Sequence, residues 1–384
     1  MAIATKKGPR TEETPPPIPD VVGHEQPRTR HFPCGGCGAG LSYSPGTSSL
    51  TCPYCGHSQE LPWLKGGDAE LDFRAWLDKA GADGLLEERL AVDCSGCGAS
   101  VEPDPEVTAM NCPFCGTSVD LRGESRRLIK PAALLPFTVD TGKARELFRD
   151  WVTSLWFAPD KLKSTARRSP PLNGIYVPYW TFDAQTESTY QGQRGTHYLV
   201  TESYSAVENG QSVTKTRTVT KTRWSPVSGR LSLWFDDLPV MACKALPRSL
   251  ADGLEPWKLG ELCAYDPQYV AGFKAQQYDV GLEEGFELAK ERMEVVLREH
   301  IEQQIGGDEQ RIDRLSTVHA DVTFKHILLP IWISAYRFGS KSYRFLINGR
   351  TGEVQGERPY SWVKIGLLVT ITVAVIGAYA WFAQ

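Results

Sequence analysis

Four C-x-x-C pairs in the first third of the chain constrain the fold more than any other feature of this 384-residue sequence. The pairs are Cys34-Gly-Gly-Cys37, Cys52-Pro-Tyr-Cys55, Cys94-Ser-Gly-Cys97 and Cys112-Pro-Phe-Cys115. Each cysteine of the last two pairs lies sixty residues after its counterpart in the first two. One offset shared by four positions indicates an internal duplication.

The spacing inside each repeat predicts a metal site. Fourteen residues separate Cys37 from Cys52, and fourteen separate Cys97 from Cys112. This gap is typical of a zinc ribbon, in which a short hairpin joins two cysteine knuckles into a closed, tetrahedral S₄ shell. We therefore expect two structural Zn²⁺ ions per chain, one in each repeat. The predicted ligands are Cys34, Cys37, Cys52, Cys55, Cys94, Cys97, Cys112 and Cys115.

Other uses of these thiols fit the sequence less well. Disulfides conflict with a polar, proline-rich start that lacks the apolar core of a secretory signal. Thioredoxin-type redox chemistry needs one C-x-x-C on a βαβ scaffold. Iron in a rubredoxin-like site remains open. His31 and His57 lie near the pairs, but four thiolates already complete the shell, and Cys243 and Cys263 are interpreted as small buried hydrophobes.

The sequence predicts a multi-domain chain: two tandem Cys₄ ribbons, an α+β domain and one transmembrane helix. The expected units are a disordered leader (1–30), ribbon 1 (31–62), a helical linker (68–90), ribbon 2 (91–122), the α+β domain (128–360) and the transmembrane helix (363–383). Apolar periodicity places amphipathic helices at 141–157 and 280–305 and strands at 327–334 and 342–347. Asn209-Gly210 predicts the turn of a hairpin over 197–224.

Residues 365–382 carry no charge and would span about 27 Å as a helix, enough for the hydrocarbon core of a bilayer. Trp362, Tyr379 and Trp381 suit the two interfaces, and a buried core helix is the alternative. Positive side chains precede this segment, at Arg358 and Lys364 among others. The positive-inside rule and the need for reduced thiols both favour a single-pass protein of the cell membrane, with most of the chain in the cytoplasm.

The net charge of −4 does not favour a general nucleic-acid binder. No phosphate loop, H-E-x-x-H or G-x-S-x-G motif occurs, so nothing indicates an enzyme. Asp236-Asp237 is interpreted as a strand-end turn. One local feature could bind an anionic surface or an acidic partner, although a solvated strand face explains it as well. It is a basic stripe formed by Lys215, Arg217, Lys221 and Arg223.

The chain resembles bacterial membrane-anchored proteins with TFIIB-type zinc ribbons, which are often catalogued as primosomal protein N′-like. Beyond the cysteines, the resemblance rests on Leu135-Pro-Phe137, the run 174–183, Phe235-Asp-Asp237, the run 329–332 and the run 343–356. The helicase label does not fit, because the phosphate loop and acidic Mg²⁺ motif of that motor are missing. The resemblance implies SPFH-domain or phage-shock-protein-A-like partners in envelope stress.

We therefore expect a membrane-tethered adaptor that recruits a protein partner at the cytoplasmic face of the bilayer. A nucleic-acid-binding ribbon protein of replication or transcription is the alternative. A metal-dependent enzyme fits least, because both predicted sites are closed.

Overall fold

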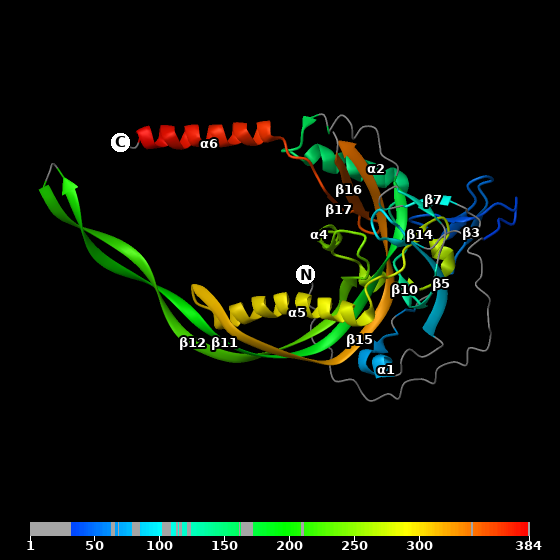
Figure 1. Ribbon diagram of the computed structural model, residues 1–384, viewed down its shortest axis with the longest axis horizontal. Helices are drawn as coiled ribbons and strands as arrows, with labels where there is room; N and C mark the ends of the chain where they lie inside the picture. The colour runs from blue at the N-terminus through cyan, green and yellow to red at the C-terminus, as the bar shows by residue number, and fades with distance from the viewer. Residues whose placement is uncertain are drawn as a thin grey trace.

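The computed structural model describes residues 32–382, with gaps at 63–65, 68, 79–84, 102–108, 113, 115–116, 121–123, 161, 163–171, 209–210 and 339–340. Figure 1 shows a sheet-rich body with the cysteine repeats on one side. Two long projections, a β-ribbon and helix α6 (Trp362–Phe382), leave the body on the other side. The leader predicted over residues 1–30 lies outside the described residues.

Three long strands form the centre of the fold: β11 (Asn173–Glu208), β12 (Gln211–Met241) and β15 (Glu309–Phe338). β11 lies in the middle and pairs antiparallel with both neighbours. Its pairing with β15 ends at Gly195, whereas its pairing with β12 continues to Glu208. The sheet is therefore wide in the body and narrows to a two-stranded ribbon.

Short strands widen the sheet at the body end. They are β4 (Leu71–Asp72), β10 (Ala133–Leu134), β13 (Cys263–Ala264), β14 (Lys274–Ala275), β16 (Lys341–Asn348) and β17 (Val354–Gly356). β10 runs parallel to β15 and pairs with β13, β14 runs parallel to β11, and β16 joins β15 to β17. β4 pairs with β15 nearer the ribbon.

Each cysteine repeat contributes its own small strands. The first repeat contains β1 (Ser42–Tyr43), β2 (Ser49–Thr51) and β3 (Ser58–Glu60) in one antiparallel sheet. The second contains β5 (Leu86–Asp93), β6 (Ser100–Val101), β7 (Ala109–Asn111), β8 (Ser118–Asp120) and β9 (Glu124–Ile129). In the second repeat, β5 pairs with β6 and β9, and β7 pairs with β8.

The two repeats cover opposite faces of the central sheet. Successive strand residues point to opposite faces. Accordingly, Tyr176 of β11 shares a core with Tyr43 of the first repeat, while Ile175 and Val177 share another with Val101 of the second. Because both faces of the sheet are covered, its strands are apolar at consecutive positions, as in 327–329.

The helices lie around this sheet. They are α1 (Phe73–Asp78), α2 (Thr141–Ser154), α4 (Arg248–Asp252) and α5 (Leu282–Ile305), with 3₁₀ turns η2 (Leu259–Glu261) and η3 (Pro267–Val270). Helix α2 begins at the predicted residue, because the Asp140 carboxylate accepts the Lys143 N–H at 2.8 Å as an N-cap. α5 buries its predicted stripe, from Phe286 to Ile301, on the three long strands.

Several boundaries differ from the sequence prediction: α2 ends at Ser154 instead of 157, the strand predicted over 327–334 is part of the much longer β15, and two further differences are larger. The helical linker expected over 68–90 contains only the short helix α1, which Asp72 caps by accepting the Ala75 N–H, and residues 86–93 form strand β5 instead. The hairpin expected over 197–224 is confirmed but is much longer, because β15 adds a third strand and with it a second line of hydrogen bonds along β11. Its turn, Asn209-Gly210, lies outside the described residues.

The three long strands bend at one level, where β12 and β15 each carry an extra residue opposite β11. Asp237 on β12 and Asp321 on β15 have positive φ angles of 49° and 50° there. A β-bulge bends its strand and increases the local twist. Asp236-Asp237 is therefore a bulge inside β12, not the strand-end turn that was predicted.

Candidate metal centres and the projecting arm

The first cysteine cluster has the geometry of a tetrahedral sulfur shell. The Sγ atoms of Cys34, Cys37, Cys52 and Cys55 all lie within 4.8 Å of one another. Two pairs, Cys34 with Cys55 and Cys37 with Cys52, are each 3.5 Å apart. In a Zn–S₄ shell with Zn–S near 2.3 Å, neighbouring sulfurs lie about 3.8 Å apart. The distances fit a shared metal and are far longer than the roughly 2.05 Å of a disulfide.

Tight backbone turns aim these sulfurs at one point. In the first knuckle the N–H of Gly36 points to the sulfur of Cys34 at 3.4 Å, and the N–H of Gly38 donates to the Cys34 carbonyl at 2.8 Å. Gly38 has a φ of +75°, and Gly56 closes the second knuckle with +73°. L-residues with a side chain rarely adopt this conformation, so the backbone turn after each of these two cysteine pairs favours glycine.

The second cluster repeats this construction. Cys94, Cys97 and Cys112 have sulfurs within 4.8 Å of one another, with Cys97 and Cys112 at 3.6 Å. The N–H of Gly96 again points to the Cys94 sulfur at 3.4 Å. The fourth predicted ligand, Cys115, lies outside the described residues. Both clusters are thus compatible with metal binding, and among the described residues no histidine nitrogen belongs to either.

The thiols of the first cluster do not ionise independently. Backbone N–H groups of Cys55 and Tyr54 lower the pKa of Cys52 to about 6. The N–H of His57 acts in the same direction on Cys55, but the other three thiols of the cluster outweigh it and raise the pKa of Cys55 to about 12. A bound cation would remove this conflict, because a coordinating thiol is deprotonated outright.

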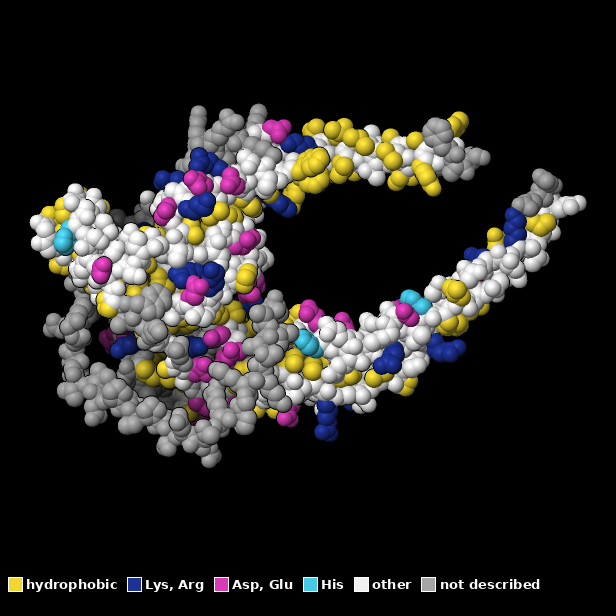
Figure 2. Space-filling view, turned by 180° about the vertical axis from the view of Figure 1, so that it is seen from behind, with side chains coloured by type: hydrophobic (Ala, Val, Ile, Leu, Met, Phe, Trp, Pro, Cys, Tyr) yellow, Lys and Arg dark blue, Asp and Glu magenta, His cyan; other side chains and the backbone are white. Residues whose placement is uncertain are grey.

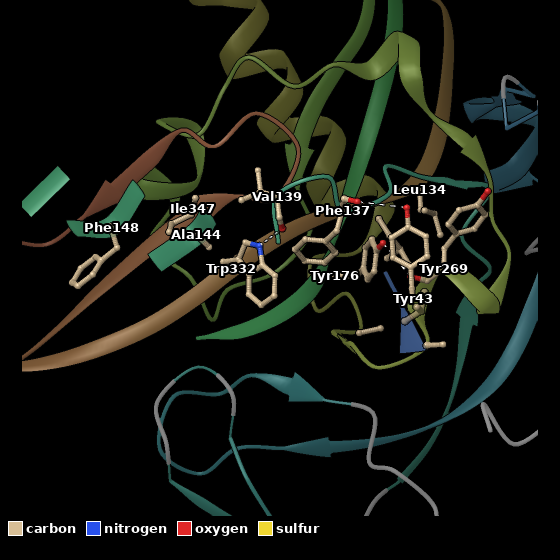
Figure 3. Packing of buried hydrophobic residues seen from close by; sticks show 14 of the residues in the cluster. Tyr43, Leu134, Phe137, Val139, Ala144, Phe148, Tyr176, Tyr269, Trp332 and Ile347 are labelled. Carbon is tan, nitrogen blue, oxygen red and sulfur yellow. Dashed lines mark hydrogen bonds between the residues drawn. The ribbon is translucent and has the colours of Figure 1, made fainter. Parts of the chain in front are cut away.

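The first repeat is fixed to the body by a shared aromatic core (Figure 3). The rings of Tyr43, from β1, and Tyr269, from η3, are 5.4 Å apart, and both lie beside Tyr176 of β11. The backbone adds two bonds, from Tyr43 N–H to Ala271 at 2.9 Å and from Gly46 N–H to Phe137 at 3.0 Å. The buried sulfurs of the repeat therefore belong to the core of the body.

The second repeat is fixed to the other face of the central sheet. The contacts come from Gln276 and Gln277, a few residues after Ala271, which binds the first repeat. Gln276 forms a bridge with Val101, and Gln277 donates from its side chain to the Leu90 carbonyl at 2.9 Å. Cys94 and Cys112 are buried in the same core as Ile175 and Val177. The ribbons were predicted as separate small units, and this docking was not anticipated from the sequence.

The two-stranded part of the ribbon projects from the body and is called the arm here; it consists of residues 196–208 and 211–223. α5 ends at Ile305 and β15 begins at Glu309, so both reach only the base of the arm. Figure 2 shows the arm as a slender projection with scattered Lys and Arg side chains. Leu199 and Val207 on it are 72% and 77% exposed.

All four residues of the predicted basic stripe lie on one face of the arm, called the basic face. Directly paired residues share a face, so Tyr198, Glu202 and Tyr204 of β11 lie there too. Glu202 binds Lys221 at 2.7 Å and Arg217 at 3.5 Å, while Arg217 and Arg223 lie over tyrosine rings. The opposite face carries His197, the exposed Leu199 and Val207, and otherwise mainly hydroxyls: Thr201, Ser203, Ser205, Thr214, Thr216, Thr218 and Thr220.

A buried charge cluster at the bend of the three long strands was missed by the sequence reading. Asp183 is 1% exposed and accepts the Asp237 N–H at 2.7 Å. Lys325 is 5% exposed and binds Asp237 at 2.6 Å and Glu70 at 3.6 Å. Burial, together with the neighbouring carboxylates, raises the pKa of Asp183 to about 7. The paired Asp236-Asp237 was the only sequence signal for this cluster.

Helix α6 differs from the other helices in the described part of the chain. Residues Trp362–Tyr379 are long and apolar enough to cross a membrane, and none of them is buried. Figure 2 shows the apolar side chains along its surface. The alternative prediction, a core helix packed within this chain, therefore does not hold.

Comparison with known proteins gives one curated relative. The chain is 27% identical over 338 residues to the uncharacterized protein YdjG of Bacillus subtilis (strain 168), covering 87% of this chain and 91% of that protein. No family model matches the chain, and no solved structure matches it. The similarity thus extends over most of both chains and identifies no activity.

Proposed function

We propose that this protein is a membrane-tethered adaptor that is built around two structural zinc ions and recruits a protein partner through its arm. The observation that carries the proposal is the arm itself. Among the described residues no third strand pairs with the arm along residues 196–208, and the described side chains there are exposed or half-exposed. An isolated two-stranded ribbon is at best marginally stable in water, so a ribbon of this length is expected to be completed by a partner.

Zinc suits the cysteine clusters on chemical grounds. A set of four thiolates selects zinc or iron, and a closed shell without an open position has a structural role. We assign one zinc to Cys34, Cys37, Cys52 and Cys55, and one to Cys94, Cys97, Cys112 and Cys115. The metal would neutralise the thiolates and hold each repeat against its face of the sheet.

We propose that α6 crosses the cell membrane with the body in the cytoplasm. Arg358 and Lys364 lie at the start of the helix, on the side of the body, as the positive-inside rule requires. The thiolates also need a reducing compartment to stay available for zinc. These two arguments are independent and give the same orientation.

The partner proposed for the arm is an acidic protein at the membrane. Four cations and two acidic residues, Glu202 and Glu208, lie on the basic face, so its net charge is positive and it favours an acidic surface. The arm and α6 leave the body on the same side, and the arm reaches about as far as the C-terminal end of α6 (Figure 1). With α6 across the bilayer in this arrangement the arm would enter the hydrocarbon, so we propose that α6 turns away from the arm where it meets the membrane, and that the partner is bound beside the bilayer. Open strand edges are not tolerated in hydrocarbon, so the arm itself stays in the aqueous phase. SPFH-domain or phage-shock-protein-A-like partners would fit the resemblance described above.

The test is recovery of partners from solubilised membranes with the full-length protein. One variant replaces Lys215, Arg217, Lys221 and Arg223 by Gln. A control variant of the same net charge replaces four exposed cations of α2 and α5 by Gln, namely Lys143, Arg145, Arg149 and Arg298. The arm variant should lose a protein partner that the control retains, and the loss relative to the natural protein should be largest at low salt and shrink as salt screens the four cations. Unchanged recovery at all ionic strengths would contradict the proposal, and recovery of nucleic acid instead of protein would favour the nucleic-acid-binding alternative.

A further inference from the structure

A loop of the body is attached to the first turn of α6, although about two hundred residues separate them in sequence. The Ser361 N–H donates to the Phe157 carbonyl at 2.7 Å. The Lys364 ammonium donates to the carbonyl of Ala158 at 3.0 Å and binds the Asp160 carboxylate at 2.7 Å. The loop after α2 is therefore held at the place where α6 leaves the body.

Exposed aromatic side chains gather at this junction. Trp156 is 73% exposed and Phe157 38% exposed, and their rings lie 6.4 Å apart. Tyr360 and Trp362, just before and at the start of α6, are 53% and 80% exposed. We call these four residues the junction patch. Trp180, Trp257 and Trp332 of the body are buried, so the exposure of two neighbouring aromatic rings here needs a reason.

The loop is built to present the two aromatics rather than to bury them. Leu155 and Ala158, on either side of them, are 6% and 2% exposed and belong to the core under α2. The flanking residues thus anchor the loop while Trp156 and Phe157 point outward. A fixed loop holds exposed rings at lower entropic cost than a flexible one.

We propose that Trp156 and Phe157 lie in the headgroup region of the same bilayer that α6 enters, as a second membrane contact made by the body. The proposal rests on the proposed insertion of α6, with which the junction patch is continuous. Trp and Tyr favour the membrane interface because one part of the ring is apolar and another can hydrogen-bond. Arg358, whose guanidinium lies 5.6 Å from the Tyr360 ring, adds a cation that suits phosphate headgroups.

This contact would fix the position of the body relative to the bilayer. A single helix leaves a soluble domain free to rotate and tilt. A second contact from a loop held by Lys364 would restrict that freedom and thus set the direction in which the arm extends. The contact between the junction patch and the lipid headgroups would therefore help to orient the arm towards its partner.

The test uses purified full-length protein in phosphatidylcholine vesicles whose acyl chains are brominated near the headgroup, since bromine quenches nearby tryptophan fluorescence. Trp156→Phe keeps an aromatic ring but removes the reporter, so the quenched fraction should fall by an amount comparable to that for Trp362→Phe. Trp234→Phe is the control, because Trp234 is 41% exposed on β12 away from the junction. That change should not lower the quenched fraction. Phe157→Trp, as a second variant, should raise it.

The outcomes separate the two proposals. An unchanged quenched fraction in Trp156→Phe and Phe157→Trp, with a clear fall in Trp362→Phe, would overturn the junction contact and leave the anchor standing. No fall in Trp362→Phe either would contradict the insertion of α6 as well.

Discussion

The backbone N–H of Tyr43 donates to the carbonyl of Ala271 at 2.9 Å, which ties the first cysteine repeat to the segment that also binds the second. A few residues later, Gln276 bridges to Val101 of the second repeat. Between these contacts, β14 pairs with β11 in the central sheet. One short segment thus connects both repeats to the sheet, so the stability of the clusters and of the body should be coupled.

Metal removal should therefore destabilise the body and not only the repeats. A chelator that strips both sites should lower the unfolding temperature of the whole domain, because binding energy at such sites is folding energy, on the order of several kcal/mol per site. Differential scanning calorimetry, with near-ultraviolet circular dichroism as a probe of the buried tryptophans, would measure this. Restoring zinc is the control. A body transition that does not move on chelation would show that the repeats are energetically independent.

Gly285→Ala should destabilise the protein although alanine is the better helix former by about 1 kcal/mol. A Cβ at Gly285 would lie 2.6 Å from Cδ1 of Trp180. That ring is fully buried and held by its bond to the Val280 carbonyl at 2.9 Å, so it cannot move aside. We expect a loss of about 1–3 kcal/mol in the free energy of unfolding. Val295→Ala, at a 59% exposed position of α5, is the control and should change little.

The charge cluster at the bend of the three long strands predicts a pH dependence. Burial raises the pKa of Asp183 from 3.8 to about 7, so the folded protein keeps a proton that the unfolded chain has lost. The stability from this group is present below about pH 4 and is lost as the pH rises through about 7. Asp183→Asn mimics the protonated form and should be more stable than the natural protein at pH 8, by on the order of 1–2 kcal/mol. Chemical denaturation at pH 5 and pH 8 would measure it, and equal stability differences at both would contradict the assignment.

The sequence predicted the features that rest on local periodicity or spacing. The cysteine sulfurs that the structure describes do gather into two clusters, and α5 buries the predicted stripe from Phe286 to Ile301. Both depend on residues close together in the chain, so a short window of sequence contains the whole signal.

The features that were missed depend on distant partners. A continuous apolar run, as in β11 and β15, does not show from the sequence which segments cover the two faces of the sheet. The docking of the two repeats on opposite faces was therefore not anticipated. The length of the arm depends on where β15 stops pairing, and the bulge at Asp237 depends on the register of three strands. The contact between Lys364 and Asp160 links segments that no local pattern relates.

The central claim, two structural zinc ions per chain held by the duplicated cysteine pairs, is tested most directly by metal analysis of the purified full-length protein with all thiols counted. We expect two zinc ions per chain. Cys52→Ser and Cys94→Ser should each lower this number to about one, whereas Cys243→Ala, which removes a buried thiol outside both clusters, should leave it at two. One zinc or fewer in the natural protein under reducing conditions, or iron in place of zinc, would contradict the account.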